Sequence, residues 1–310
     1  MSEGSDVEAA VSTGTVHAED GRTLAYADGG DPTGYPVIGL HGTPGCRLSR
    51  MIDDSIYVEA GVRYITTDRA GYGLSSRHRG RSVADEAADV LAVADGLGLR
   101  KFAVLGGSGG GPHALACAAL LGGRVERVAC QSSVAPLGRR GLTRAEWLTG
   151  MDPEIAEELA WADAGEAVLA REMTLAQELM TQRINEKPGA LLGQDASPGD
   201  VEFLLRPEVL AAFRRIIPEQ ARHGVWGSVD DTLAFVRDWG FDLSSITVPV
   251  LLTYGDADSS CPASHGRFLA AAIATATVEE KLGGGHFDTD PTTEVLAVHR
   301  WLRTGEHPKN

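Results

Sequence analysis

Long apolar runs and positive charge are both scarce in this sequence. No stretch of about 18 apolar residues occurs among its 310 residues, which excludes a transmembrane helix. Lysine and arginine number 28 against 43 aspartates and glutamates, so the formal net charge is −15. Such a chain repels the phosphates of nucleic acids and the anionic surface of a membrane. We therefore expect a small-molecule substrate rather than a nucleic-acid or membrane partner.

Cysteine is also scarce, and the four cysteines contain no C-x-x-C pair. Cys46, Cys117, Cys130 and Cys261 are scattered along the chain, which disfavours a metal centre or a disulfide framework. The start, MSEGSDVEAAVSTG, is acidic and polar and lacks the apolar segment of a signal peptide. We expect four free thiols, a cytoplasmic protein, and no metal or organic cofactor. Nothing in the sequence bears on the oligomeric state.

Short apolar runs alternate with helix-like segments through much of the chain. YPVIGLHG, VRYITTDRAGYG, KFAVLGG and RVERVACQSSVA are strand-like, and the segments 47–60, 82–99 and 111–121 between them are helix-like, the second with Ser82 as its N-cap. An Asp-Gly turn at Asp20 and Gly21 joins two earlier strands. The strand-like runs are apolar enough for burial on both faces. This pattern predicts an α/β protein whose mostly parallel sheet is covered by helices.

The alternation stops in the middle of the chain. Residues 137–240 contain only helical stretches, one of which has Asp152 as its N-cap and Pro153 at its first helical position. Strands return with ITVPVLLTYGDAD. We predict a core domain of residues 1–136 and 241–310, with about the first dozen residues disordered. The segment 137–240 is predicted to be a helical cap inserted over one end of the sheet.

A single serine stands among five glycines in VLGGSGGGPH. Ser108 follows a strand-like run and precedes a helix with Pro112 in its first turn. With Gly106 and Gly110 it forms G-x-S-x-G, a strained strand-to-helix turn that raises the hydroxyl above the sheet edge. Side chains at the flanking positions would collide with the adjacent strand and helix. A phosphate-binding loop fits less well. The glycine segment has no lysine, which a Walker loop needs, and Pro112 stands where the dinucleotide fingerprint G-x-G-x-x-G needs its third glycine.

A serine hydroxyl is a weak nucleophile and needs a base that an acid orients. On this architecture the acid and then the histidine follow the serine. His286 fits the role of base, because GGGHF places it in a glycine loop between the last strand and the last helix. His113 lies five residues into the helix after the serine and is expected to point away from it. His265 is expected on a helix surface.

Two aspartates compete for the role of the acid. The strand-like VPVLLTY ends in GDADSSCP, which holds Asp256 and Asp258, and α/β proteins place function in such loops. The strand after the serine turn ends in CQSSVAP, without a carboxylate. Asp256 stands at the bend, where we expect it to cap the N–H groups of its own turn. Asp258 lies further along, within reach of the His286 loop, and is the preferred acid.

Acyl transfer also requires donors for the negative charge of the tetrahedral intermediate. One is the N–H of Gly109, directly after the serine, and the other is expected from the loop LHGTPG. In that loop Thr43 is placed to donate its N–H, whereas Pro44 has none to donate. His41 is expected to brace the loop rather than to transfer protons.

The segments HGTPG, DRAGYGLSS, GGSGGG, GDADSSCP and GGGHF occur in this order, and together they resemble the α/β-hydrolase superfamily in its HGxPG branch with a cap. The resemblance covers nearly the whole core and leaves the cap unmatched. It implies an α/β-hydrolase fold. The family's triad acid usually stands at the position of Asp258, followed four residues later by a proline, here Pro262. The implied catalytic triad is Ser108, Asp258 and His286.

The resemblance implies a serine hydrolase, and a carboxylic-ester hydrolase is the preferred activity. Carbon–carbon bond hydrolases, lactonases and amidases use the same triad and stay open. Proline iminopeptidases share the HGxPG and DRxGxGxS segments but typically carry tryptophan after the serine, where this chain has Gly109. A non-catalytic small-molecule binding protein is the alternative of another class, since fold alone does not settle function. An apparently complete triad disfavours it.

Substrate selectivity is expected to lie in the cap. Its large apolar side chains could line a pocket for a small apolar substrate, although each is more often explained by helix packing. The candidates are Trp147, Trp161, Met173, Met180, Phe203 and Trp226.

Overall fold

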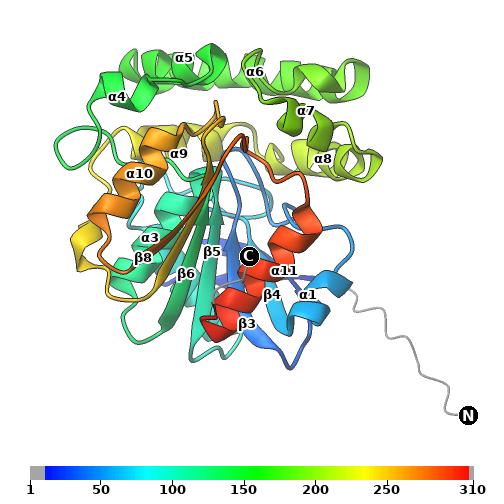
Figure 1. Cartoon of the computed structure of the whole chain (residues 1–310), viewed down its shortest axis with the longest axis vertical. Helices are drawn as coiled ribbons and strands as arrows, with labels where there is room; N and C mark the ends of the chain where they lie inside the picture. The colour runs from blue at the N-terminus through cyan, green and yellow to red at the C-terminus, as the bar shows by residue number, and fades with distance from the viewer. Residues whose placement is uncertain (1–10, 307–310) are drawn as a thin grey trace, which may run out of the picture.

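One eight-stranded sheet runs through the centre of the molecule. The structure, a computed structural model, describes residues 11–306. The strand order is β1-β2-β4-β3-β5-β6-β7-β8, in which β1 pairs antiparallel with β2, β2 pairs antiparallel with β4, and the other neighbours are parallel (Figure 1). The predicted α/β class and mostly parallel sheet are confirmed. The strands are β1 (Ser12–His17), β2 (Thr23–Gly30), β3 (Tyr35–Leu40), β4 (Val62–Thr67), β5 (Phe102–Gly107), β6 (Val125–Gln131), β7 (Val250–Gly255) and β8 (Ala276–Lys281).

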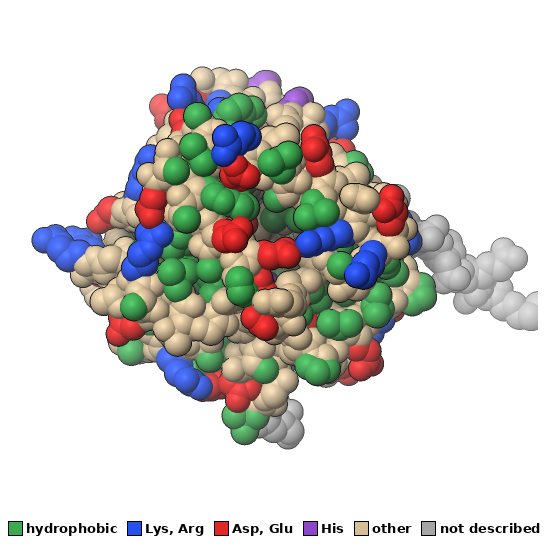
Figure 2. Space-filling view, turned by 90° about the horizontal axis from the view of Figure 1, so that it is seen from above, with side chains coloured by type: hydrophobic (Ala, Val, Ile, Leu, Met, Phe, Trp, Pro, Cys, Tyr) green, Lys and Arg blue, Asp and Glu red, His purple; other side chains and the backbone are tan. Residues whose placement is uncertain are grey.

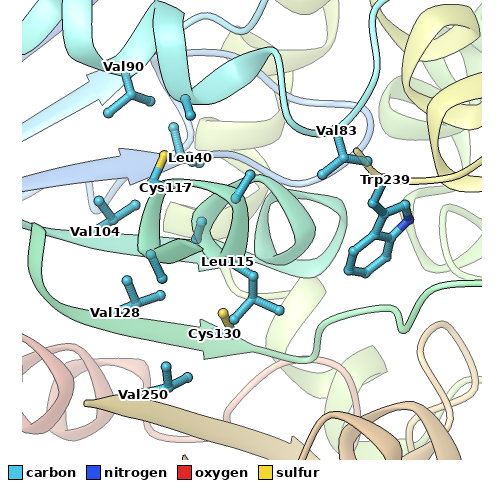
Figure 3. Close-up of a cluster of buried hydrophobic side chains, with 14 of the residues drawn as sticks. Leu40, Val83, Val90, Val104, Leu115, Cys117, Val128, Cys130, Trp239 and Val250 are labelled. Atoms are coloured by element: carbon cyan, nitrogen blue, oxygen red, sulfur yellow. The ribbon is translucent and has the colours of Figure 1, made fainter. Parts of the chain in front are cut away.

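Helices cover both faces of the sheet because successive strand residues point to opposite sides. Ile38 and Val104 belong to the cluster beneath α2, α3 and α10, in which Leu115 of α3 lies near Cys130 of β6 (Figure 3). Their neighbours Val37 and Leu105 pack on the other face, against α1 and α11. The sheet is therefore buried on both sides, as its apolar runs predict. These helices are α1 (Ser55–Ala60), α2 (Glu86–Gly96), α3 (Gly111–Leu120), α10 (Ala263–Ala272) and α11 (Pro291–Thr304).

An all-helical segment is inserted between β6 and β7. Figure 1 shows α4 to α8 of this segment as a layer across one end of the sheet, which confirms the inserted helical cap. As predicted, Asp152 is the N-cap of α5, and its side chain accepts a hydrogen bond from the N–H of Glu154 at 2.9 Å. The exact limits at residues 137 and 240 stay a prediction. The helices are α4 (Arg144–Leu148), α5 (Pro153–Asp163), α6 (Glu166–Glu186), α7 (Pro198–Leu204), α8 (Pro207–Gln220) and α9 (Trp226–Phe235).

Two predictions about helix starts are wrong. In the segment 47–60 only the last six residues are helical, because Arg47 turns inward and pairs with Asp68 at 2.8 Å. Ser82 is not the N-cap of α2. Its N–H and hydroxyl bond the carboxylate of Asp85, and the helix begins only after that residue.

The first strand and the cysteines can also be compared with the predictions from the sequence. β1 begins at Ser12, inside the dozen residues predicted to be disordered, and residues 1–10 lie outside the described range. All four cysteines are free and buried. Within residues 11–306, no helix is long and apolar enough to cross a membrane.

Candidate active site

The backbone at Ser108 forms the strained turn that its glycines predict. Between β5 and α3, Ser108 has a φ of +52°, in the left-handed region that non-glycine residues rarely adopt. A Cβ on Gly106 would lie 2.4 Å from the carbonyl oxygen of Gly110, and a Cβ on Gly110 would lie 2.2 Å from the oxygen of Leu40. Only glycine fits at either position. The turn leaves the Ser108 residue partly exposed at the end of the sheet.

Asp258 and His286 meet beyond the carboxyl ends of β7 and β8. Asp258 Oδ2 accepts a hydrogen bond from His286 Nδ1 at 2.8 Å, and Oδ1 accepts from the N–H groups of Ser260 and Cys261, both at 2.8 Å. Burial raises the pKa of Asp258, but the imidazole and these N–H groups outweigh it and hold the pKa below its usual value. Burial lowers the pKa of His286, but Asp258 outweighs it and raises the pKa above its usual value. Because Nδ1 donates to the carboxylate, Nε2 is the basic nitrogen.

Asp256 has a different partner from the one predicted. Its Oδ1 accepts from the N–H of Gly283 at 2.6 Å, in the glycine segment that leads to His286. The N–H groups of the turn itself are bonded by Asp258, so the prediction that Asp256 caps its own turn is wrong. The physical reason is that β7 and β8 are adjacent parallel strands, and the loops after them therefore lie side by side.

Among the described residues, the Ser108 hydroxyl makes no hydrogen bond to the His286 imidazole. Within the described residues its hydrogen-bond contact is a long one, 4.0 Å from Ser108 Oγ to Cys261 Sγ. Burial raises the pKa of the Cys261 thiol well above its usual value, so the thiol is neutral and a weak partner. Contacts between a nucleophile and its base are often long until substrate binds.

The two predicted oxyanion donors lie against each other. A Cβ on Gly109 would be 2.3 Å from Thr43 Oγ1 and 3.1 Å from the Thr43 nitrogen. The carbonyl of Gly42 accepts from His41 Nδ1 at 2.7 Å and from Arg69 Nη2 at 3.2 Å. This carbonyl and the Thr43 N–H belong to one trans peptide and point in opposite directions. His41 and Arg69 therefore brace the loop from one side and leave the Thr43 N–H on the other.

A buried carboxylate from the cap also holds this loop, and the sequence reasoning missed it. Asp231, on α9, has no exposed surface. Burial raises its pKa, but two arginines outweigh that effect and hold it well below its usual value. No local pattern marks this residue, because its partners come from other segments of the chain. They are Thr43 Oγ1 at 2.7 Å, Arg69 Nη2 at 2.5 Å, Tyr72 OH at 2.8 Å, Arg81 Nη2 at 2.6 Å and His113 Nε2 at 3.2 Å.

His286 is held through its backbone as well as through its ring. Asp200 of α7 accepts from the N–H groups of His286 at 3.0 Å and Phe287 at 2.7 Å. Ser132, directly after β6, donates its hydroxyl to the His286 carbonyl at 3.2 Å. Sequence reasoning missed both residues. Asp200 stands three residues after Ser197, and this S-x-x-D pattern indicates only the helix N-cap that Ser197 indeed forms.

His113 and His265 are buried and form hydrogen bonds to groups other than the Ser108 hydroxyl. His113 contacts the α9 carboxylate and Val83 O at 3.4 Å, so its ring is turned to other partners than the serine. The prediction that His265 lies on a helix surface is wrong. It has no exposed surface, its Nδ1 accepts from the N–H of Ala135 at 3.0 Å, and its Nε2 donates to the Trp147 carbonyl at 2.8 Å. This neutral ring ties α10 to the start of the cap.

The six apolar candidates of the cap do not gather in one place. Phe203 lies against the His286 loop, where its ring stacks on Phe287 with 4.9 Å between centroids. Trp147 is buried and donates its Nε1–H to the Ala135 carbonyl at 2.8 Å, an arrangement that fits packing. Trp161 and Met173 pack between α5, α6 and α9, Met180 Sδ contacts Gln220 at 3.6 Å, and Trp226 is partly exposed with Arg77 over its ring at 4.0 Å.

The cap face is hollowed near its centre. Figure 2, which looks down on the cap, shows this hollow edged by hydrophobic and acidic side chains. A cavity of about 260 Å³ adjoins the His286 loop and is lined in part by Ser132, Lys281 and Gly285. Within residues 11–306, no group of three His, Cys, Asp or Glu side chains is placed to hold a metal ion.

Comparisons with known proteins agree with this architecture. Residues 35–290 match the alpha/beta hydrolase fold family, and the chain belongs to that family. It is 29% identical to a non-heme chloroperoxidase of Streptomyces lividans over 91% of this chain and 96% of that protein. It is 34% identical to a proline iminopeptidase of Xanthomonas citri over 34% of each chain. An esterase structure from Exiguobacterium antarcticum has the same fold, with a TM-score of 0.64, 22% identity and coverage of 94% of this chain and 99% of that one.

The rate at which a fluorophosphonate probe phosphonylates Ser108, with release of fluoride, can separate the roles of the two aspartates. In the wild type, labelling should slow as the pH drops through the raised pKa of His286, since only the neutral imidazole can accept a proton. Asp258→Asn removes the carboxylate that raises this pKa and orients the ring. Labelling should slow by about 10²- to 10⁴-fold, and the acid limb of its pH profile should move to lower pH.

Asp256→Asn is the matched control on the same turn. It weakens one bond to the Gly283 N–H, so the labelling rate should stay within a few-fold of the wild type while the melting temperature falls slightly. Rates and melting curves of both variants decide the assignment. The reversed pattern would make Asp256 the acid.

Proposed function

We propose that this protein is a serine hydrolase that cleaves a carboxylic ester of a small apolar substrate through an acyl-enzyme. The observation that carries the proposal is the convergence of three features at one end of the sheet. They are the strained turn of Ser108, the 2.8 Å bond between Asp258 and His286, and the braced Thr43 loop against Gly109. Each feature supplies one requirement of acyl transfer.

In the acylation step Ser108 Oγ attacks the acyl carbon while His286 Nε2 takes the hydroxyl proton. The carbonyl π electrons move to the oxygen, and the N–H groups of Thr43 and Gly109 stabilise the resulting oxyanion. Asp258 stabilises the imidazolium through Nδ1–H. The imidazolium then protonates the leaving alcohol, and the tetrahedral intermediate collapses to an ester on Ser108.

Deacylation uses the same groups in reverse. His286 Nε2 takes a proton from water as the water oxygen attacks the acyl carbon. The second tetrahedral intermediate collapses to the carboxylic acid, and the imidazolium returns its proton to Ser108 Oγ. Asp258, which raises the pKa of His286, supports this role, because a more basic Nε2 is a better proton acceptor.

The surroundings of the site favour an uncharged substrate. The hollow of the cap face, with its hydrophobic and acidic edge (Figure 2), is the route we propose for the substrate. The formal net charge of −15 and the acidic edge both oppose anionic groups. Lactones, amides and activated carbon–carbon bonds fit the same chemistry, and a non-catalytic binding protein is the alternative of another class.

One similarity favours a second candidate activity. The similar protein from Streptomyces lividans, which this chain matches over most of its length, is named a non-heme chloroperoxidase. A Ser108 acyl-enzyme could be attacked by hydrogen peroxide in place of water, which would release a peroxyacid and the free serine. The peroxyacid could then oxidise a halide ion outside the protein.

Ser108→Ala should lose turnover of p-nitrophenyl esters by about 10³-fold or more, because the covalent step has no substitute. Mass spectrometry of the wild type after fluorophosphonate treatment should place the adduct on Ser108. The control is Ser55→Ala, which changes an exposed serine and should keep full activity. An adduct on another serine contradicts the mechanism. Absence of both turnover and labelling would favour the binding protein.

Phe203 and Trp147 should respond differently to replacement by alanine. Phe203→Ala removes the ring stacked beside the His286 loop and should change the ratio of rates among p-nitrophenyl esters of different acyl length. Trp147→Ala opens a buried cavity and should lower the free energy of unfolding by about 3–5 kcal/mol, without changing that ratio. An unchanged ratio in Phe203→Ala would mean that this ring only packs.

The peroxide reaction is tested by adding acetate ester and hydrogen peroxide and measuring peroxyacid. The second candidate predicts peroxyacid in the wild type at a rate well above the background of ester and peroxide alone. Ser108→Ala should reduce it to that background. Peroxyacid that forms equally well with the variant would exclude an acyl-enzyme as its source.

A further inference from the structure

The cap lies on the His286 loop through a row of side chains on and just after α7. Asp200 bonds the N–H groups of His286 and Phe287, and Phe203 stacks on the Phe287 ring. Arg206, just beyond the helix, donates to the Thr289 carbonyl at 2.5 Å. Positions 200 and 203 are three residues apart, the spacing of one helix face, and Arg206 continues the row beyond the end of the helix. This face of the cap therefore follows the loop along its length.

The Asp200 side chain is almost completely buried. Only 2% of Asp200 is exposed, and its Oδ2 also accepts from the Ser197 hydroxyl at 2.9 Å. A Cβ on Gly285 would lie 2.1 Å from Asp200 Oδ2, so the loop needs glycine there for this approach. Hydrogen bonds from backbone N–H groups to a carboxylate are among the stronger ones in proteins. They determine where the His286 backbone lies.

A second cap helix, α9, contacts the loop that carries the proposed oxyanion donor Thr43. On α9, Asp231 Oδ2 accepts from Thr43 Oγ1 at 2.7 Å, and the same hydroxyl accepts from Arg69 Nη2 at 2.9 Å. The Thr43 side chain is thus held between a cap carboxylate and a core guanidinium. Its backbone N–H is the proposed oxyanion donor.

We propose that the cap is a fixed part of the catalytic centre, in which Asp200 positions His286 and Asp231 positions Thr43. This proposal rests on the proposed function, in which His286 is the base and the Thr43 N–H is an oxyanion donor. Asp200 and Asp231 are themselves buried, and their bonds to the core are charge-assisted, so lifting the cap would break all of these bonds together. Substrate and product therefore pass through the cap, and the cap does not leave the core during turnover.

Few charged groups act on the His286 ring. The carboxylate of Asp258 bonds Nδ1, and the Asp200 carboxylate lies on the backbone side, where its charge also favours the imidazolium. Lys281, on β8, is paired with Asp288 at 2.5 Å and with Glu294 at 2.6 Å. Neutralising Asp200 should therefore lower the pKa of His286.

Asp200→Asn tests the first contact. We expect kcat to fall about tenfold while KM changes less than threefold, because misplaced catalytic groups affect the chemical step more than binding. The acid limb of the kcat profile should move to lower pH. Glu202→Gln, which removes the same charge from an exposed position on α7, is the matched control and should leave kcat and the profile unchanged. An Asp200→Asn enzyme with wild-type kcat and pH profile would overturn the proposal.

Thr43→Val tests the second contact and removes the hydroxyl while keeping the backbone N–H. Its kcat should fall about tenfold, and Thr43→Ser, which restores the hydroxyl, should recover most of the loss. The arginines keep Asp231 paired in both variants, so melting temperatures should stay close to the wild type. Equal kcat in the valine and serine variants would overturn the proposal, and this pair decides the matter if Asp200→Asn does not fold.

Labelling of wild-type Ser108 separates this proposal from the proposed function. The fluorophosphonate adduct could form on Ser108 while Asp200→Asn, Glu202→Gln and both Thr43 variants label at the wild-type rate. That result would support the serine hydrolase and contradict the fixed cap. If Ser108 is not labelled and no ester is cleaved, the proposed function itself fails.

Discussion

The contact between a cap carboxylate and buried arginines determines how the two parts of this molecule fit together. Asp231 has no exposed surface and accepts hydrogen bonds from Arg69 and Arg81, which are themselves buried. A charge in the interior is tolerated only when it is paired and hydrogen-bonded, and removal of one partner leaves the others uncompensated. The position of α9, the segment after β4 and the Thr43 loop therefore depend on one another.

The parallel sheet explains why residues far apart in the sequence meet. β3, β5, β6, β7 and β8 all run in the same direction, so the loops after them emerge at one end. Those loops carry Thr43, Ser108, Ser132, Asp258 and His286 in chain order. The cap lies over the same end and contributes two further carboxylates. The proposed chemistry thus depends on a single edge of the molecule.

Family membership leaves the reaction open, and the structure suggests where differences between relatives arise. Proteins similar to this chain are named chloroperoxidase, iminopeptidase and esterase, although the fold is shared. The proposed triad of Ser108, Asp258 and His286 would serve the cleavage of several kinds of bond. In our proposal the cap both shapes the approach to that geometry and holds its parts in place, so a change in the cap would alter rate and selectivity together.

Local patterns in the sequence were sufficient to predict the sheet, the inserted cap and the turn of Ser108, because apolar periodicity and glycine sterics act over a few residues. The pairing of Asp258 with His286 could be anticipated from the loops that carry them. Asp200 and Asp231 could not, since a carboxylate on a helix looks the same whether it faces water or a buried arginine. His265 was misplaced for a similar reason: its partners are backbone groups that only the folded chain brings near. The tertiary structure alone decided which polar side chains are buried, because burial depends on residues that are distant in the sequence.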